Sequence, residues 1–112
     1  MNNWSPDMNA LNFLGFDCRI VKRHYANGVI ALELIAAETD KNINNDTFPG
    51  ERICVATTCV PTASLLENET CIKNFSENTG IEHVLVEAGI IKLTGRSYKT
   101  GYVNVPIVEV LI

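Results

Sequence analysis

The chain has 112 residues, of which 46% are hydrophobic and 20% are charged, and its formal net charge is −4. This length predicts one domain with a core that needs no disulfide or metal. The acidic balance makes nucleic acid an unfavourable partner, because neutralising phosphates requires clustered lysine and arginine. No stretch approaches the roughly 20 apolar residues of a membrane span, and residues 1–16 lack the features of a signal peptide. We therefore expect a cytoplasmic protein with no membrane segment and with four reduced cysteines.

The N-terminal segment, residues 1–15, is predicted to be partly flexible or to form a short helix, and residues 16–112 are predicted to form a single α+β domain. Pro6 favours the start of a helical turn, since proline is tolerated early in a helix. The turn would end at Gly15. It would dock on the domain through apolar side chains, namely Met8, Leu11, Phe13 and Leu14.

Residues 17–38 predict a β-hairpin whose turn lies within Ala-Asn-Gly at 26–28. Asn-Gly favours a two-residue type I′ turn, in which both central residues need positive φ. That loop would place Lys22 opposite Glu33, a favourable charge pair. A three-residue loop would place Lys22 opposite Leu32 instead, so two registers remain open.

The middle of the chain predicts polar loops and short strands. Residues 39–51 are rich in Asn and Asp and favour a loop. Residues 52–60 are rich in β-branched side chains and favour one strand, which Pro61 would end. Residues 62–66 are predicted to be a short helix or a loop. Residues 70–75 are predicted to be a short strand, with an edge position as one option.

Residues 78–88 predict the main helix, because apolar side chains recur there at helical spacing. Ser76 or Asn78 would cap its start, and Gly89 would cap its end. The stripe that would be buried consists of Ile81, Val84, Leu85 and Ala88.

The C-terminal part predicts strands at 90–93 and 102–112, joined by a polar turn at 94–101. Pro106 would place the last strand at an edge or at a bulge. That strand is too apolar for an open edge, so it lies inside the sheet or forms a homodimer with a second chain. Together the elements predict an antiparallel sheet of about five strands packed against the helix at 78–88.

Three motifs carry a resemblance to a known family. They are Tyr-Ala-Asn-Gly at 25–28, Phe-Ser-Glu-Asn at 75–78 and Thr-Gly-Arg at 94–96. In these motifs the chain resembles a family of small proteins of unassigned activity encoded on plasmids, integrative elements and phages. The resemblance covers residues 16–110 and transfers no catalytic residue. The resemblance implies that the chain is encoded on a mobile element. Such elements often encode small acidic proteins that act on host machinery or on host defence.

The cysteines and histidines lack the spacing of a metal or catalytic site. Structural zinc sites use cysteines about two to four residues apart, whereas Cys54 and Cys59 are five apart. Cys18 and His24 would lie roughly 20 Å apart along one strand, too far for a nucleophile and its base. We therefore expect no metal, no cofactor and no catalytic residue.

The predicted turn at 94–101 holds the candidate contact site. Three positive charges and one ring gather in a short segment of an acidic chain, at Lys92, Arg96, Tyr98 and Lys99. Arg and Tyr are favoured anchors of protein interfaces. The sequence therefore predicts a non-catalytic protein-interaction module of a mobile element. One alternative is a small nucleic-acid-binding module using the same four residues, and another is a cysteine- or metal-dependent enzyme.

Overall fold

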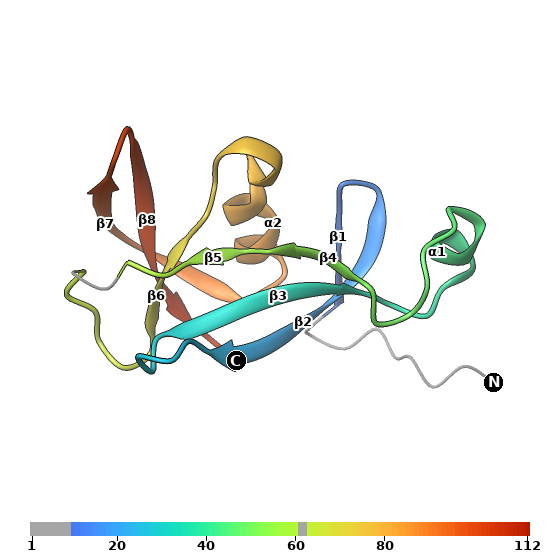
Figure 1. Cartoon of the computed structure of the whole chain (residues 1–112), viewed down its shortest axis with the longest axis horizontal. Helices are drawn as coiled ribbons and strands as arrows, with labels where there is room; N and C mark the ends of the chain where they lie inside the picture. Colours follow the sequence, from blue (N-terminus) through green and yellow to red (C-terminus); the bar gives the residue numbers. More distant parts are fainter. Residues whose placement is uncertain (1–9, 61–62) are drawn as a thin grey trace.

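A computed structural model describes residues 10–60 and 63–112, which form two four-stranded antiparallel sheets and two short α-helices (Figure 1). Sheet A has the order β1-β2-β3-β4, and its strands are Ala10–Phe13, Phe16–His24, Ile30–Ala36 and Arg52–Val55. Sheet B has the order β5-β6-β8-β7, and these strands are Thr57–Thr58, Glu69–Ile72, Val103–Val110 and Ile91–Thr100. The helices are α1 (Asp40–Asn44) and α2 (Ile81–Glu87), and the 3₁₀ turn η1 (Ser76–Asn78) precedes α2.

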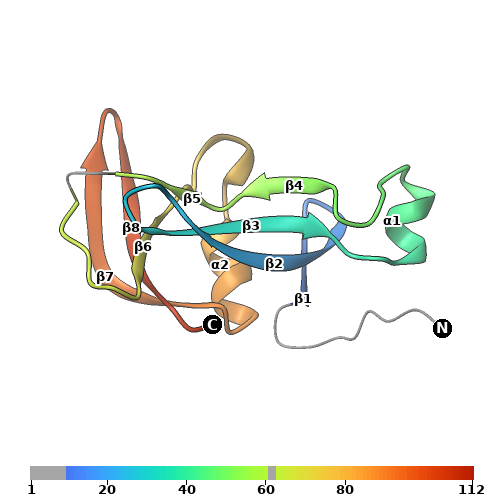
Figure 2. The same cartoon turned by 60° about the horizontal axis from the view of Figure 1, so that its bottom comes forward.

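The predicted α+β class with antiparallel strands is confirmed. The prediction of one sheet of about five strands is wrong, because the strands divide between two sheets. The molecule measures 45 × 26 × 25 Å. Along its length, α1 lies at one end and the β7–β8 hairpin at the other, as both views show (Figures 1 and 2).

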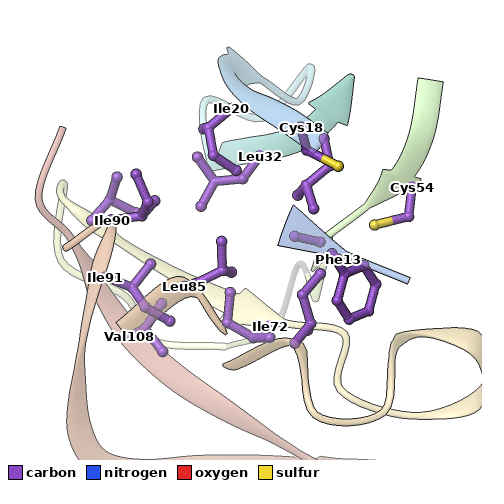
Figure 3. Close-up of a cluster of buried hydrophobic side chains, with 14 of the residues drawn as sticks. Phe13, Cys18, Ile20, Leu32, Cys54, Ile72, Leu85, Ile90, Ile91 and Val108 are labelled. Carbon is purple, nitrogen blue, oxygen red and sulfur yellow. The ribbon is translucent and has the colours of Figure 1, made fainter. Parts of the chain in front are cut away.

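The main hydrophobic core lies where the two sheets and α2 meet (Figure 3). Leu32 from β3, Ile72 from β6 and Leu85 from α2 are fully buried in it. The predicted helical stripe is confirmed, since Ile81 and Leu85 are buried while Val84 and Ala88 pack against the same core. Burying each large aliphatic side chain contributes about 1.5–3 kcal/mol, so this junction holds the sheets together.

A second hydrophobic cluster lies on the other face of sheet B and consists of Val60, Cys71, Val105 and Ile107. Strand alternation sends Val108 and Val110 from β8 into the main core. Strand β8 is therefore buried on both faces. It also lies between β6 and β7, so of the two predicted options the structure shows the interior one.

The hairpin between β2 and β3 has a three-residue loop, and Lys22 opposes Leu32. Of the two registers left open, the structure therefore shows the one with a three-residue loop, and the pairing of Lys22 with Glu33 is not formed. The Gly28 amide donates to the Tyr25 carbonyl oxygen at 2.9 Å, and Gly28 has a φ of 88°. This arrangement, a type I turn closed by a left-handed glycine, adds one residue to the loop and shifts the register.

The two-residue primed turn occurs instead between β1 and β2. Leu14 and Gly15 have φ values of 56° and 82°, and Phe13 pairs with Phe16 across them. The predicted helical turn ending at Gly15 is thus wrong for residues 10–13, which form β1. Its earlier part, including Pro6 and Met8, lies outside the described residues.

The predicted strand at 52–60 is interrupted at Ala56. Strand β4 before it belongs to sheet A and β5 after it belongs to sheet B. The Ala56 amide donates to Leu32 at 2.8 Å, and its carbonyl oxygen accepts from Lys73 at 2.8 Å. The backbone therefore crosses from one sheet to the other within one residue. Residues 61–62 are not among those described.

One of three local predictions in the middle of the chain needs correction, and for the other two, which left alternatives open, the structure shows which alternative is formed. The predicted loop at 39–51 contains α1, whose N-cap Thr39 accepts a hydrogen bond from the Asn42 amide. Strand β6 is interior rather than an edge strand, since β5 and β8 flank it. Residues 63–66 contain no helix.

The helix and the strand after it also differ in their bounds. Helix α2 begins at Ile81 with Gly80 as its N-cap and no side-chain cap bond, so the predicted caps Ser76 and Asn78 are wrong. Gly89 does follow its last turn with a φ of 75°. The predicted turn at 94–101 is wrong for residues 94–100, which belong to β7, and only Gly101 lies in the turn before β8. The register of β7 against β8 shifts between Leu93 and Ser97.

Candidate functional site

The four predicted contact residues, Lys92, Arg96, Tyr98 and Lys99, all lie on β7, an edge strand of sheet B. The fold already uses two of them. Arg96 forms an ion pair with Glu69, and the ring of Tyr98 packs against the second hydrophobic cluster. Lys92 and Lys99 are exposed, opposite Glu109 and Asn104 on β8. The structure thus divides the predicted set into two exposed charges and two groups engaged in the fold.

Glu69 is the buried partner of this ion pair, with 5% of its side chain exposed. It accepts a hydrogen bond from the Leu66 amide at 2.9 Å as well as from Arg96. These bonds hold the pKa of the Glu69 carboxyl below its usual value, the Leu66 amide most strongly. Glu69 also lines a shallow cleft of about 200 Å³ together with Leu65, Leu66 and the turn at 27–29.

The thiols serve packing. Cys18 and Cys54 lie in the main core (Figure 3), where burial raises the pKa of each to about 11. Burial also raises the pKa of Cys71, which is fully buried in the second cluster. Both imidazoles, His24 and His83, are exposed on separate elements. Within residues 10–60 and 63–112, no group of three or more His, Cys, Asp or Glu side chains could hold a metal ion.

Two arginines of β2 and one of β4, Arg19, Arg23 and Arg52, lie on the face of sheet A that points away from the main core. Strand pairing places Arg19, Ile35 and Arg52 in one row across β2, β3 and β4. In the next row Val21, Glu33 and Val55 are neighbours. We call this surface the outer arginine face, and it consists of Arg19, Val21, Arg23, Glu33, Ile35, Arg52 and Val55. Sequence patterns did not indicate this surface, although Arg19 and Val21 alternate with the buried residues Cys18 and Ile20.

Glu33 organises the outer arginine face. Its Oε1 lies 2.8 Å from Arg23 Nε, and its Oε2 lies 3.2 Å from Arg52 Nη2. Its side chain is 14% exposed, whereas those of Arg23 and Arg52 are 62% and 64% exposed. One half-buried carboxylate therefore holds two guanidinium groups in place at the surface.

Residues 37–51, which we call the acidic loop, form a second distinctive surface around α1. Asn42 is fully buried, and its Nδ2 donates to the carbonyl oxygens of Asp17 and Ala37, both at 2.8 Å. Its Oδ1 accepts from the Asp17 amide at 3.0 Å. The ends of the loop are joined because the Gly50 amide donates to Ala36 at 2.9 Å. This long connection is thus bound to sheet A.

The acidic loop exposes apolar side chains, with Phe48 70% and Ile43 50% exposed. It carries a single positive charge, Lys41, against four exposed carboxylates, namely Glu38, Asp40, Asp46 and Glu51. In both views the loop lies at the end of the molecule opposite the β7–β8 hairpin (Figures 1 and 2).

No helix among the described residues is both long and apolar enough to cross a membrane. Comparison of the chain with protein-family models, with curated proteins and with solved structures gives no match.

Proposed function

We propose that the protein is a non-catalytic interaction module that docks on a partner protein through the acidic loop. The observation that carries this proposal is that a rigidly bound loop displays Phe48 and Ile43 to solvent. Loops that carry function are commonly held in position by a rigid scaffold. A preorganised loop loses little conformational entropy on binding, so more of the contact energy appears as affinity.

The hydrogen bonds of Asn42 support the proposal that the acidic loop presents its apolar side chains to a partner. Two side-chain hydrogen bonds of Asn42 join the centre of the loop to Asp17 of β2, and a third joins it to Ala37, the first residue of the loop. Despite this bracing, Phe48 is left outside the core at 70% exposure. Burying an exposed phenylalanine in a pocket of a partner is a typical interface anchor.

The charge of the loop defines the partner. Four carboxylates around two apolar side chains match an apolar pocket with a rim of Lys or Arg. The resemblance to proteins of plasmids, integrative elements and phages supports a host protein as that partner, with modulation of host machinery or defence as the outcome. Nucleic-acid binding through β7 has less support, because Arg96 is paired with Glu69 and Tyr98 packs inside.

A photo-crosslinking amino acid at position 48 tests the proposal in the native host cells. Tyr102, in the turn between β7 and β8, is a matched control, since it is an aromatic residue that is 105% exposed. That hairpin lies at the end of the molecule opposite the acidic loop (Figure 1). We expect a discrete crosslinked product from position 48 and none from position 102. Equal products from both positions, or none from position 48, would contradict docking through this loop.

A substitution measures the same contact quantitatively. Phe48→Ala should weaken binding to the crosslinked partner by about 30-fold, as expected for an interface anchor worth about 2 kcal/mol. Tyr102→Ala should leave the affinity unchanged. Both variants should keep the wild-type unfolding midpoint, because neither ring is buried.

A further inference from the structure

The outer arginine face has more guanidinium groups than free carboxylates. Glu33 contacts Arg23 and Arg52 through one nitrogen each. A guanidinium has five N–H donors, so donors remain on both arginines for an external acceptor. Among the described residues Arg19 has no ion-pair partner, while Asp17 on the same strand is bound by Asn12 at 3.1 Å.

The position of the arginines is set before any ligand binds. Glu33 is directed outward from the central strand β3, and it holds one arginine on each neighbouring strand. Arg19 and Arg52 lie on opposite sides of Ile35 in one row, so they are two strand spacings apart, roughly 10 Å. Planar guanidinium groups held in this way bind carboxylates with two parallel hydrogen bonds.

The floor of the face distinguishes between anionic partners. Between the arginines lie the half-buried aliphatic side chains of Val21, Ile35 and Val55. β3 and β4 contain no aromatic residue, and Phe16 of β2 packs against the main core. Single-stranded nucleic acids bind proteins largely by stacking on aromatic rings, which this face lacks. Aliphatic and guanidinium groups together complement a polypeptide that carries both carboxylates and apolar side chains.

We propose that the outer arginine face binds an extended, carboxylate-rich segment of a partner protein. Glu33 is its positioning residue, and Arg19, Arg23 and Arg52 bind the carboxylates. Charge complementarity carries this assignment, since the face presents three guanidinium groups around a single ion-paired glutamate. The site adjoins the acidic loop, since Arg52 directly follows Glu51, but it is of opposite charge, so the two surfaces select partners of different chemistry.

The experiment uses the full chain and a fluorescein-labelled ten-residue peptide of alternating Glu and Val, followed by fluorescence anisotropy. The competing probes are oligothymidylate of ten nucleotides and inorganic phosphate. We expect the peptide to bind, to be displaced by salt and to bind more tightly than either competitor. No peptide binding, or tighter binding of oligothymidylate, would overturn the proposal.

Arg19 provides the decisive variant, because its side chain is exposed and no described residue pairs with it. Arg19→Gln should weaken peptide binding about tenfold, the effect of one charge-assisted hydrogen-bonded contact. Lys99→Gln removes the same charge from β7 and should change the affinity less than about twofold. Arg19→Lys keeps the charge without the planar group and should give an intermediate affinity. Equal losses from Arg19→Gln and Lys99→Gln would show binding to net charge alone and would overturn the assignment.

Discussion

Strand β7 and the outer arginine face are both rich in positive charge, but they arise in opposite ways. On β7 the cations are close together in the sequence, and the fold separates them. There Arg96 pairs with Glu69, whereas Lys92 and Lys99 remain in solvent. On the outer arginine face Arg19 and Arg52 are 33 positions apart in the chain, and strand pairing brings them into one row.

The contrast shows that charge clustering along a chain is a weak guide to a binding surface. In a strand, neighbouring residues point to opposite faces, and a bulge changes which face follows. Between antiparallel strands, residues far apart in the chain lie about 5 Å apart. Surface chemistry is therefore decided by register, and register depends on turns such as the one at Gly28.

The cysteines also show that closeness in the chain does not give a similar environment, and their labelling rates provide the largest effect that we expect to measure. Cys54 and Cys59 are close in the chain, yet Cys54 is buried in the main core with a pKa of about 11. At pH 8 this pKa leaves about 100-fold less thiolate than the ordinary value of 9.0 does. We expect iodoacetamide to label the partly exposed Cys59 first and to label Cys54 at least about 100-fold more slowly than an exposed thiol of ordinary pKa, as measured by peptide mass spectrometry. Equal labelling in the native protein would show that the core is open at Cys54.

Tyr98 and Lys99 test whether β7 serves the fold or the surface. Tyr98→Ala should lower the free energy of unfolding by about 2 kcal/mol, because the ring packs against Val105 and its neighbours. Lys99→Ala should change it by less than about 0.5 kcal/mol. Urea denaturation measures both values. An unchanged free energy of unfolding in Tyr98→Ala would show that the ring does not contribute to the packing of the second hydrophobic cluster.

Acid should reveal the Arg96–Glu69 pair. The lowered pKa of Glu69 means that its stabilising contribution is complete above pH 4.5, the ordinary value, and is lost as pH falls through the lowered value. Wild-type protein should therefore lose stability more steeply below pH 4.5 than Glu69→Gln does. Urea midpoints at several pH values between 2.5 and 5 measure this difference. If the urea midpoints of the wild type and of Glu69→Gln depended on pH in the same way, the Arg96–Glu69 pair would contribute nothing to stability.

The smallest effect is expected on the outer arginine face. Arg23→Ala removes an ion pair whose arginine is 62% exposed, so the free energy of unfolding should fall by less than about 1 kcal/mol. The same substitution should reduce the free energy of binding of the Glu-Val peptide by more than it reduces the free energy of unfolding, since Arg23 is a proposed contact of the peptide. A large loss of stability in urea, with unchanged peptide affinity, would make Arg23 a structural residue.

Sequence patterns predicted the elements whose signals are local. The stripe from Ile81 to Ala88 predicted α2, because helical periodicity reflects burial directly. The hairpin of β2 and β3 was also predicted, but sequence patterns left two registers open, and the structure shows the one with the three-residue loop. Asn-Gly favours a primed turn, yet the primed turn is found at Leu14-Gly15, where no Asn or Asp is present.

The features that sequence patterns missed depend on contacts between distant residues. No residue near Ala56 signals that the chain changes sheets there, since its hydrogen bonds go to Leu32 and Lys73. The acidic loop was predicted as a loop, but its bracing depends on Asn42 reaching Asp17, 25 positions away. Among the candidate site residues, the charges on β7 could be identified from the sequence. That Glu69 pairs with Arg96 and leaves Lys92 and Lys99 exposed could not.

The crossing at Ala56 has a mechanical consequence. A tension that separates the sheets must stretch the backbone at Ala56, because its amide is hydrogen-bonded to Leu32 of sheet A and its carbonyl oxygen to Lys73, the residue that follows β6 of sheet B. Neither half can loosen alone, so amide hydrogens of both sheets should exchange with solvent in a single concerted opening. A break in the backbone at this position would give one fragment with all four strands of sheet A and another with all four strands of sheet B, each exposing the apolar face that it buries in the main core.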